Sequence, residues 1–350
     1  MDGRRVLDAD GHVVEPGWLF EAWCPPGRVV LDLPATTPVV PCGDADVVAD
    51  QLESGFDAPS YLRAMDRQQI DAVVLYPSIG LFVPFLPELS TDEAIAACRA
   101  YNEWIVAYCA AEPSRLAGVG VVPLIHVGAA VEEVERIADS GLVGVLARPN
   151  ALYDRELGAP AYDRLWAAVA EAGLVLAVHE GLGLPGPTIG SERFTTFVER
   201  HACSHPLEQM AAMAGLLLGG ALERHPTLRV AFLESGTGWL PYWLARLDAH
   251  ADWMRDSECA ALTMKPSEYF ARQCVISSEA DDELIGHSVA SVGADHVVWA
   301  SDFPHPDAVY PGAAVAFVAE ASAHGVAAAD IDAILWDTPL RFYGLADRFS

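Results

Sequence analysis

The stretch Leu174-Val175-Leu176-Ala177-Val178-His179-Glu180 contains five apolar residues in succession and ends in a histidine and a glutamate. The run Ala72-Val73-Val74-Leu75-Tyr76 has the same apolar character. Strands that are apolar at every position are buried on both faces, which is typical of a parallel sheet covered by helices on each side. These two stretches therefore predict an α/β fold built on a parallel sheet.

Short β-rich runs alternate with helical patterns along the whole chain. Eight such runs and about eight intervening helices predict one (β/α)8 TIM barrel over residues 1–350. An open doubly wound sheet is the alternative, although no glycine-rich phosphate-binding loop follows the first run. The predicted strands are Arg5–His12, Ala72–Pro77, Leu116–Pro123, Gly141–Pro149, Leu174–His179, Leu228–Glu234, Gln273–Ser278 and His296–Asp302. The predicted helices are Ser60–Gln69, Asp92–Glu112, Val127–Asp139, Ala161–Ala172, Pro206–Arg224, Leu240–Met254, Asp281–Val292, Ala313–His324 and Asp330–Leu335.

Two connections are unusually long for a compact barrel. Residues 21–58 are rich in proline and glycine, and residues 181–204 include the sequence Gly-Leu-Gly-Leu-Pro-Gly-Pro. Each follows a predicted strand, so in a barrel each lies at the carboxyl face of the sheet. Loops of this length are often lids or binding loops. We therefore predict loop insertions at about 21–58 and 181–204 beside the active site.

The composition restricts the partners and the location of the protein. The chain has 21 Lys and Arg against 49 Asp and Glu, which gives a formal net charge of −28. Nucleic acids and anionic membranes attract basic proteins, so this charge argues against both as partners. The seven cysteines are scattered without a CxxC motif, and no signal peptide or membrane-spanning segment is apparent. These features predict a soluble cytoplasmic protein that acts on a small molecule.

Metal-binding residue types stand at the ends of several predicted strands. Asp10 and His12 lie two residues apart on the first strand, so their side chains point to the same side. In a barrel the carboxyl ends of all strands meet at one face, where the active site lies. Carboxylates and imidazoles together at that face predict a divalent-metal site. The candidate ligands are Asp10, His12, His179, Glu234 and Asp302, with His205 as a further ligand.

Other polar residues near these strand ends have candidate supporting roles. Arg148 and Asn150 suit a substrate carboxylate or phosphate, because a guanidinium can bind either through two parallel hydrogen bonds. A structural ion pair is an equal alternative for Arg148. Glu15, Glu180 and His305 are expected behind the metal ligands rather than on the metal itself.

Each of the stronger candidates also has a purely structural interpretation. His179, at a strand end, can be a hydrogen-bonded core residue. Asp302, before Phe-Pro, can form a turn, and His205, before a proline, can start a helix. Glu279, at a strand end, can lie at the rim of a site without a role.

Four sequence blocks together resemble the amidohydrolase-related family, a branch of the amidohydrolase superfamily. They occur in the family's order over essentially the whole chain: Leu7–His12, Val178–Gly181, Glu234–Trp239 and Ser301–His305. The resemblance implies a distorted amidohydrolase-type TIM barrel with one or two divalent metals. It also implies that a strand-one pair, a strand-five histidine and a strand-eight aspartate hold the metal, which here are Asp10, His12, His179 and Asp302. A homodimer is the assembly that the resemblance implies.

The strand-six block departs from the family's decarboxylases. This block reads Phe232-Leu233-Glu234-Ser235-Gly236, whereas the corresponding block of those decarboxylases resembles Phe-Ala-His-Gly-Gly. Their histidine is a catalytic acid or base, and this chain has Glu234 in its place. Together with Asp10 and Asp302, Glu234 would place three negative charges in one pocket. A single divalent cation would leave one of these charges uncompensated, which is costly in a buried site. Two divalent ions and a bridging hydroxide would be neutral. We therefore expect two divalent ions, with iron favoured over manganese or zinc because mixed carboxylate and histidine sets suit paired iron.

This ligand pattern resembles the subset of the family that contains platensimycin-type diterpenoid non-haem di-iron hydroxylases. The leading hypothesis is therefore a non-haem di-iron monooxygenase that hydroxylates a bulky, apolar terpenoid or acyl-type molecule and receives electrons from a donor. Its catalytic residues would be Glu234, Asp302 and His205. The alternative is a divalent-metal-dependent decarboxylase or hydrolase of a carboxylate-bearing small molecule. A third hypothesis is a barrel without activity that serves only in binding.

Overall fold

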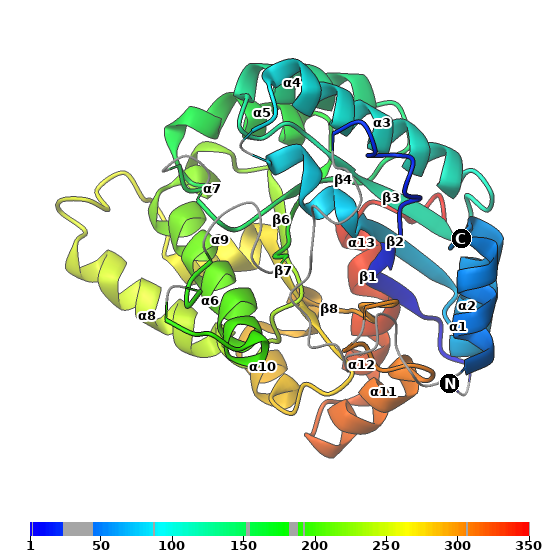
Figure 1. Ribbon diagram of the computed structural model, residues 1–350. Coiled ribbons are helices and arrows are strands. Elements are labelled where there is room, and N and C mark those ends of the chain that lie inside the picture. Colours follow the sequence, from blue (N-terminus) through cyan, green and yellow to red (C-terminus); the bar gives the residue numbers. More distant parts are fainter. Residues whose placement is uncertain are drawn as a thin grey trace.

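The sheet of this protein is a barrel of eight parallel strands in sequential order, surrounded by helices (Figure 1). The computed structural model describes residues 1, 3–23, 45–86, 88–151, 155–181, 188–191, 193–305 and 307–349. The strands are β1 (Leu7–Val13), β2 (Ala72–Pro77), β3 (Leu116–Val121), β4 (Gly144–Ala147), β5 (Val175–Val178), β6 (Arg229–Phe232), β7 (Cys274–Ser278) and β8 (Val297–Trp299).

The chain after β8 returns to β1 and nearly closes the sheet. The Asp302 amide donates to the Asp10 carbonyl at 3.0 Å, and the His12 amide donates to the Phe303 carbonyl at 2.7 Å. These bonds extend the ladder beyond the three residues of β8. The predicted (β/α)8 TIM barrel is therefore confirmed, and each predicted strand overlaps an observed one.

The strand residues are buried on both faces, as their apolar sequences predict. Val175, Leu176, Ala177 and Val178 of β5 have no exposed surface, because the barrel interior covers one face and helices cover the other. None of the helices in the described part of the chain is long and apolar enough to cross a membrane.

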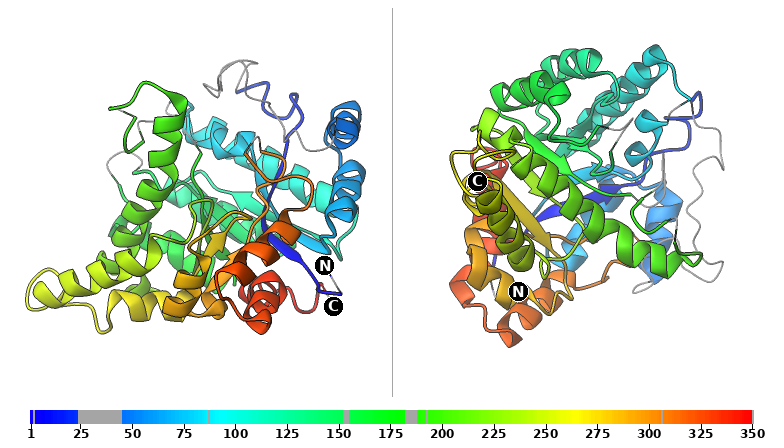
Figure 2. Two further views of the ribbon diagram at one scale, coloured as in Figure 1. Left: turned by 90° about the horizontal axis from the view of Figure 1, so that it is seen from below. Right: turned by 90° about the vertical axis from the view of Figure 1, so that its left-hand side faces the viewer.

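The helices pack around the barrel, and α8 with the segment after it projects from the side (Figures 1 and 2). Ser90 caps α3 through a reciprocal pair of hydrogen bonds with Glu93. The helices are α1 (Ala45–Ser54), α2 (Ala58–Gln68), α3 (Thr91–Cys109), α4 (Val127–Ile137), α5 (Asp163–Glu171), α6 (Phe197–Leu218), α7 (Ala221–Arg224), α8 (Leu240–Trp253), α9 (Pro266–Gln273), α10 (Ile285–Val292), α11 (Ala313–Ala323), α12 (Ala328–Asp332) and α13 (Thr338–Phe342), and a π-helical turn (Ala333–Asp337) lies between the last two.

Helix α6 begins nine residues earlier than the predicted start at Pro206. Its N-cap is Thr196, whose hydroxyl accepts a hydrogen bond from the Glu199 amide at 3.4 Å. Pro206 lies inside the helix, where it has no N–H to donate to the preceding turn, yet the helix continues through it to Leu218. His205 is consequently a residue of the helix and not the residue before it.

The two predicted loop insertions are only partly loops in the described residues. Residues 24–44 of the first insertion lie outside the described part, and residues 45–54 form α1. In the second insertion, residues 182–187 and 192 lie outside it, and the chain is helical from Phe197. The sequence analysis also missed α9 and α13, which are short helices that each begin at or next to a proline.

Candidate metal centre

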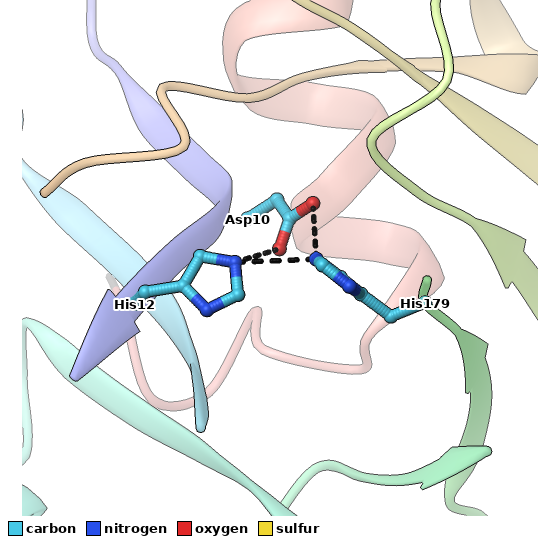
Figure 3. A group of neighbouring side chains, drawn as sticks. All are labelled: Asp10, His12 and His179. Atoms are coloured by element: carbon cyan, nitrogen blue, oxygen red, sulfur yellow. Dashed lines mark hydrogen bonds and ion pairs between the residues drawn. The ribbon is translucent and has the colours of Figure 1, made fainter. Parts of the chain in front are cut away.

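The predicted ligands gather at the carboxyl end of the barrel. Asp10 and His12 belong to β1 and point to the same side, and His179 directly follows β5 (Figure 3). Glu234 is the second residue after β6, and Asp302 is the third residue after β8. The barrel therefore brings together side chains that are nearly 300 residues apart in the sequence.

Three of these side chains, Asp10, His12 and His179, surround one point, and Asp302 lies beside one of them, His12. The His12 Nε2 atom lies 3.2 Å from the His179 Nε2 atom and 3.4 Å from Asp302 Oδ1. The Asp10 oxygens lie 3.6 Å from His12 Nε2 and 3.4 Å from His179 Nε2 (Figure 3). Two atoms that each bind one ion at about 2.1 Å in tetrahedral geometry are about 3.4 Å apart. The spacing of Asp10, His12 and His179 therefore fits a shared ion, and Asp302 Oδ1 reaches the same His12 nitrogen from the side.

The two buried histidines present lone pairs to each other. His12 Nδ1 lies 2.9 Å from the Pro77 carbonyl, and His179 Nδ1 lies 2.7 Å from the Glu180 carbonyl. A carbonyl only accepts hydrogen bonds, so each Nδ1 carries the proton and each Nε2 is unprotonated. Both Asp10 oxygens are buried without a hydrogen-bond partner. A divalent cation would satisfy all of these atoms at once, and the residues present therefore fit one.

Burial and mutual repulsion change the acidity of this group. Burial and the nearby Asp302 carboxylate raise the pKa of Asp10 well above its usual range. Burial, together with the positive charge of the nearby His305, holds the pKa of His12 well below its usual range. Without a bound cation, the site therefore favours neutral side chains over ionised ones.

His305 lies beside both Asp302 and His12, and one ligand-type atom of each of the three lies within 4.8 Å of the others. Its Nδ1 atom is 2.7 Å from Asp302 Oδ1, and its Nε2 atom is 3.2 Å from the Ser78 hydroxyl. Its ring packs on His12, with centroids 4.0 Å apart. Burial alone would lower the pKa of His305, but the Asp302 carboxylate raises it to about 10. His305 therefore orients Asp302 and compensates its charge.

Glu234 lies beside this group and contacts a further histidine. Its Oε2 atom is 3.5 Å from His179 Nε2, and its Oε1 atom is 3.5 Å from His205 Nε2. Its backbone has a φ of 50°, which non-glycine residues rarely adopt, and its amide donates to the Ser277 hydroxyl at 2.9 Å. Burial and the Asp302 carboxylate raise the pKa of Glu234 to about 8.

Arg148 forms the structural ion pair, which was the equal alternative to substrate binding. Its guanidinium is fully buried and donates to Asn150 Oδ1 at 2.9 Å, to Glu180 Oε1 at 3.2 Å and to the Gly181 carbonyl. Neither Arg148 nor Asn150 is among the described residues that line the cavity at the site. Arg148 therefore fixes the chain after β4 against the chain after β5.

Glu15 holds the loop that follows β2. Its carboxylate accepts hydrogen bonds from the amides of Ser78, Ile79 and Gly80 at 3.2, 2.9 and 2.8 Å. Asp8, which the sequence analysis did not consider, accepts from the Ser301 amide at 3.0 Å and ties β1 to the end of β8. Glu15 thus holds three backbone amides, and Asp8 holds both the amide and the hydroxyl of Ser301.

A cavity of about 280 Å³ opens beside Glu234 and Asp302. His201 and Asp307, which the sequence analysis did not place in the site, also line it, as does Glu279, for which the sequence left open a rim position without a role. His201 and His205 are four residues apart, which places both on one face of a helix. The start of α6 was predicted at Pro206, so this spacing was not recognised.

The family comparison matches almost the whole chain. The model of the amidohydrolase family covers residues 7–345, so the chain belongs to this family. A 2-amino-3-carboxymuconate-6-semialdehyde decarboxylase from Dictyostelium discoideum is 23% identical over 304 residues, which are 86% of this chain and 82% of that protein. A gamma-resorcylate decarboxylase from a Rhizobium species is 24% identical over 269 residues, which are 69% of this chain and 75% of that protein.

Solved structures have the same fold over nearly their whole length. An amidohydrolase from Mycobacterium avium subsp. paratuberculosis has a TM-score of 0.81 at 22% identity and covers 98% of this chain and 100% of its own. A 5-carboxyvanillate decarboxylase from Sphingomonas paucimobilis has a TM-score of 0.75 at 20% identity, with 98% and 99% covered. A dihydroxybenzoic acid decarboxylase from a Polaromonas species, with bound manganese, has a TM-score of 0.72 at 16% identity, with 98% of each chain covered.

These relatives correct the leading hypothesis. The prediction of a non-haem di-iron monooxygenase, an oxidoreductase of the hydroxylase subset, is wrong, because the relatives found are decarboxylases. A divalent-metal site fits the residues, but nothing favours iron, and solved relatives contain manganese. The error has a physical cause, since these oxygen and nitrogen ligands suit iron, manganese and zinc alike and so do not identify the metal.

Proposed function

We propose that this protein is a divalent-metal-dependent decarboxylase of a carboxylate-bearing small molecule. The buried arrangement of Asp10, His12, His179 and Asp302, with its unpaired oxygens and facing lone pairs, is the observation that carries the proposal. The decarboxylase relatives that match most of the chain support this reaction class. The alternative of the sequence analysis thus replaces its leading hypothesis.

Asp10, His12, His179 and Asp302 would hold the ion. Manganese and zinc both suit a set of two imidazoles and two carboxylates. A bound ion supplies Lewis-acid polarisation of a substrate oxygen. His305 keeps Asp302 oriented, and the main-chain carbonyls of Pro77 and Glu180 keep both imidazoles in the tautomer that can bind a metal.

Decarboxylation breaks a C–COO⁻ bond, releases carbon dioxide and leaves a carbon that takes up one proton. Glu279 is the candidate donor of that proton, since it lines the cavity beside Glu234 and Asp302. Burial and the nearby Asp282 and Glu234 carboxylates raise the pKa of Glu279 well above its usual range, which favours the protonated form that can donate. The Ser277 hydroxyl lies 3.2 Å from Glu279 Oε1 and fixes its position.

The test is an anaerobic assay with gamma-resorcylate, 5-carboxyvanillate and related carboxylates, in the presence of Mn²⁺. We expect carbon dioxide and the decarboxylated product in equal amounts, loss of the reaction with a chelator, and recovery on adding Mn²⁺. In D2O, the product should carry one deuterium at the carbon that lost the carboxylate. A product formed without carbon dioxide, or one that requires oxygen, would contradict the proposal.

A further inference from the structure

A second group of ligand-type side chains lies on the far side of Glu234. His201 and His205 project from one face of α6, with ring centroids 4.5 Å apart. One ligand atom from each of His201, His205 and Glu234 lies within 4.8 Å of the others. Asp307 Oδ2 is a further 3.6 Å from His201 Nε2. We call these four residues the helix group, and Asp10, His12, His179 and Asp302 the strand-end group.

The hydrogen bonds of His205 leave one ring nitrogen open toward Glu234. The Ser204 hydroxyl donates to the His201 carbonyl at 3.3 Å and lies 3.0 Å from His205 Nδ1. With its proton on the His201 carbonyl, this hydroxyl accepts from Nδ1–H, and in that tautomer His205 Nε2 is unprotonated. This nitrogen is 3.5 Å from Glu234 Oε1, which is too far for a good hydrogen bond but fits two ligands of one ion.

The cavity in front of the helix group is strongly acidic. Its described lining contains five carboxylate side chains and no lysine or arginine. Such a cavity attracts cations, and a divalent ion would offset the repulsion among the carboxylates. The five acidic residues are Glu234, Glu279, Asp281, Asp302 and Asp307.

Glu234 connects the two groups. Its Oε2 atom faces His179 of the strand-end group, while its Oε1 atom faces His205 of the helix group, both at 3.5 Å. We propose that His201, His205, Glu234 and Asp307 form a second divalent-cation site, and that Glu234 bridges it to the first. Two imidazoles and two carboxylates suit Mn²⁺ or Zn²⁺. The inference concerns ion binding alone, so it does not depend on the proposed reaction.

The test is to titrate metal-free protein with Mn²⁺ and to follow bound metal and the electron paramagnetic resonance spectrum. We expect two ions per chain, with the spectrum of an isolated ion giving way to that of a coupled pair as the second ion binds. His201→Ala and His205→Ala should each bind one ion, with the uncoupled spectrum. His250→Ala, on α8 and away from the site, should bind two and is the matched control.

Three results would overturn the inference. They are one ion per chain in the unaltered protein, two uncoupled ions, or two coupled ions in both His201→Ala and His205→Ala. Thermal unfolding of the metal-free variants shows whether each is folded, and the milder His201→Asn and His205→Gln repeat the test if an alanine variant is not. A protein that binds two coupled ions but releases no carbon dioxide would refute the decarboxylase proposal alone.

Discussion

The two histidine pairs of this site are held in different ways. His12 and His179 have no exposed surface, and the Nδ1 atom of each faces a main-chain carbonyl of the barrel. On α6, the His201 side chain is 32% exposed, and His205 Nδ1 lies 3.0 Å from the Ser204 hydroxyl. The strand-end group is therefore positioned by the backbone before any ion arrives, whereas the helix group depends on side chains that can move. We expect the first to bind its ion more tightly than the second.

The largest effect is expected when the strand-end group loses a ligand. His179→Ala should lower kcat/KM by about 10⁴-fold, because a metal ion supplies several kcal/mol of transition-state stabilisation. Steady-state kinetics and elemental analysis at matched Mn²⁺ concentrations measure the change. If His201→Ala were equally damaging while His179→Ala kept its metal, the ranking of the two groups would be reversed.

The buried ion pair behind the strand-end group should contribute to folding. Arg148→Met leaves Glu180 buried without its cation, which should cost about 3–5 kcal/mol of unfolding free energy. Urea denaturation measures the loss. The double variant Arg148→Met with Glu180→Gln should recover part of it, since no uncompensated charge remains. An unchanged urea midpoint for Arg148→Met would show that the pair is not structural.

A substitution of Glu279 tests whether this residue of the cavity wall donates the proton to the product carbon. Glu279→Gln keeps the size of the side chain but cannot donate a carboxyl proton, so kcat should fall by about 10²-fold or more. Metal content should stay the same, because Glu279 belongs to neither ligand group. Deuterium incorporation in D2O identifies the affected step. Full activity in Glu279→Gln would assign the proton to another group.

The smallest effect is the pH dependence of the metal-free protein. Burial raises the pKa of Glu234 to about 8, so the folded state keeps a proton that the unfolded chain loses near pH 4.5. Stability from this group is present below pH 4.5 and is lost as the pH rises toward 8.

Urea midpoints at pH 5, 6.5 and 8 should show this loss. Glu234→Gln should remove a contribution to the slope on the order of 1 kcal/mol per pH unit, which is the effect of one proton. Saturating Mn²⁺ should also flatten the slope, because a cation holds the carboxylate ionised. A slope identical in the unaltered protein and in Glu234→Gln would show that Glu234 titrates as in solution.

The barrel could be predicted from the sequence because its signals are local. Runs such as Leu174–Val178 are apolar at every position, and the residue type changes sharply where each strand ends. The start of α6 was not predicted, because the helix was expected to begin at Pro206, whereas it is capped at Thr196 and continues through the proline. That single error hid the relation of His201 to His205.

The ligand positions were predictable, but the reaction was not. Asp10 and His12 share a face because strand side chains alternate, and the barrel brings His179 and Asp302 to the same end. The types of these residues suit iron, manganese and zinc alike, so they carry no information on oxygen chemistry. The expected homodimer and the cytoplasmic location stay predictions.

Glu234 and Asp302 share an unusual backbone, with φ angles of 50° and 53°. A left-handed conformation costs an L-residue on the order of 1–3 kcal/mol unless the surroundings compensate for it. Glycine adopts the same backbone geometry without strain. We therefore expect Glu234→Gly to raise the free energy of unfolding while it removes the carboxylate proposed to bridge the two ion sites. Selection of random variants for thermal stability alone would therefore favour the loss of the Glu234 carboxylate, and with it the loss of a proposed metal ligand.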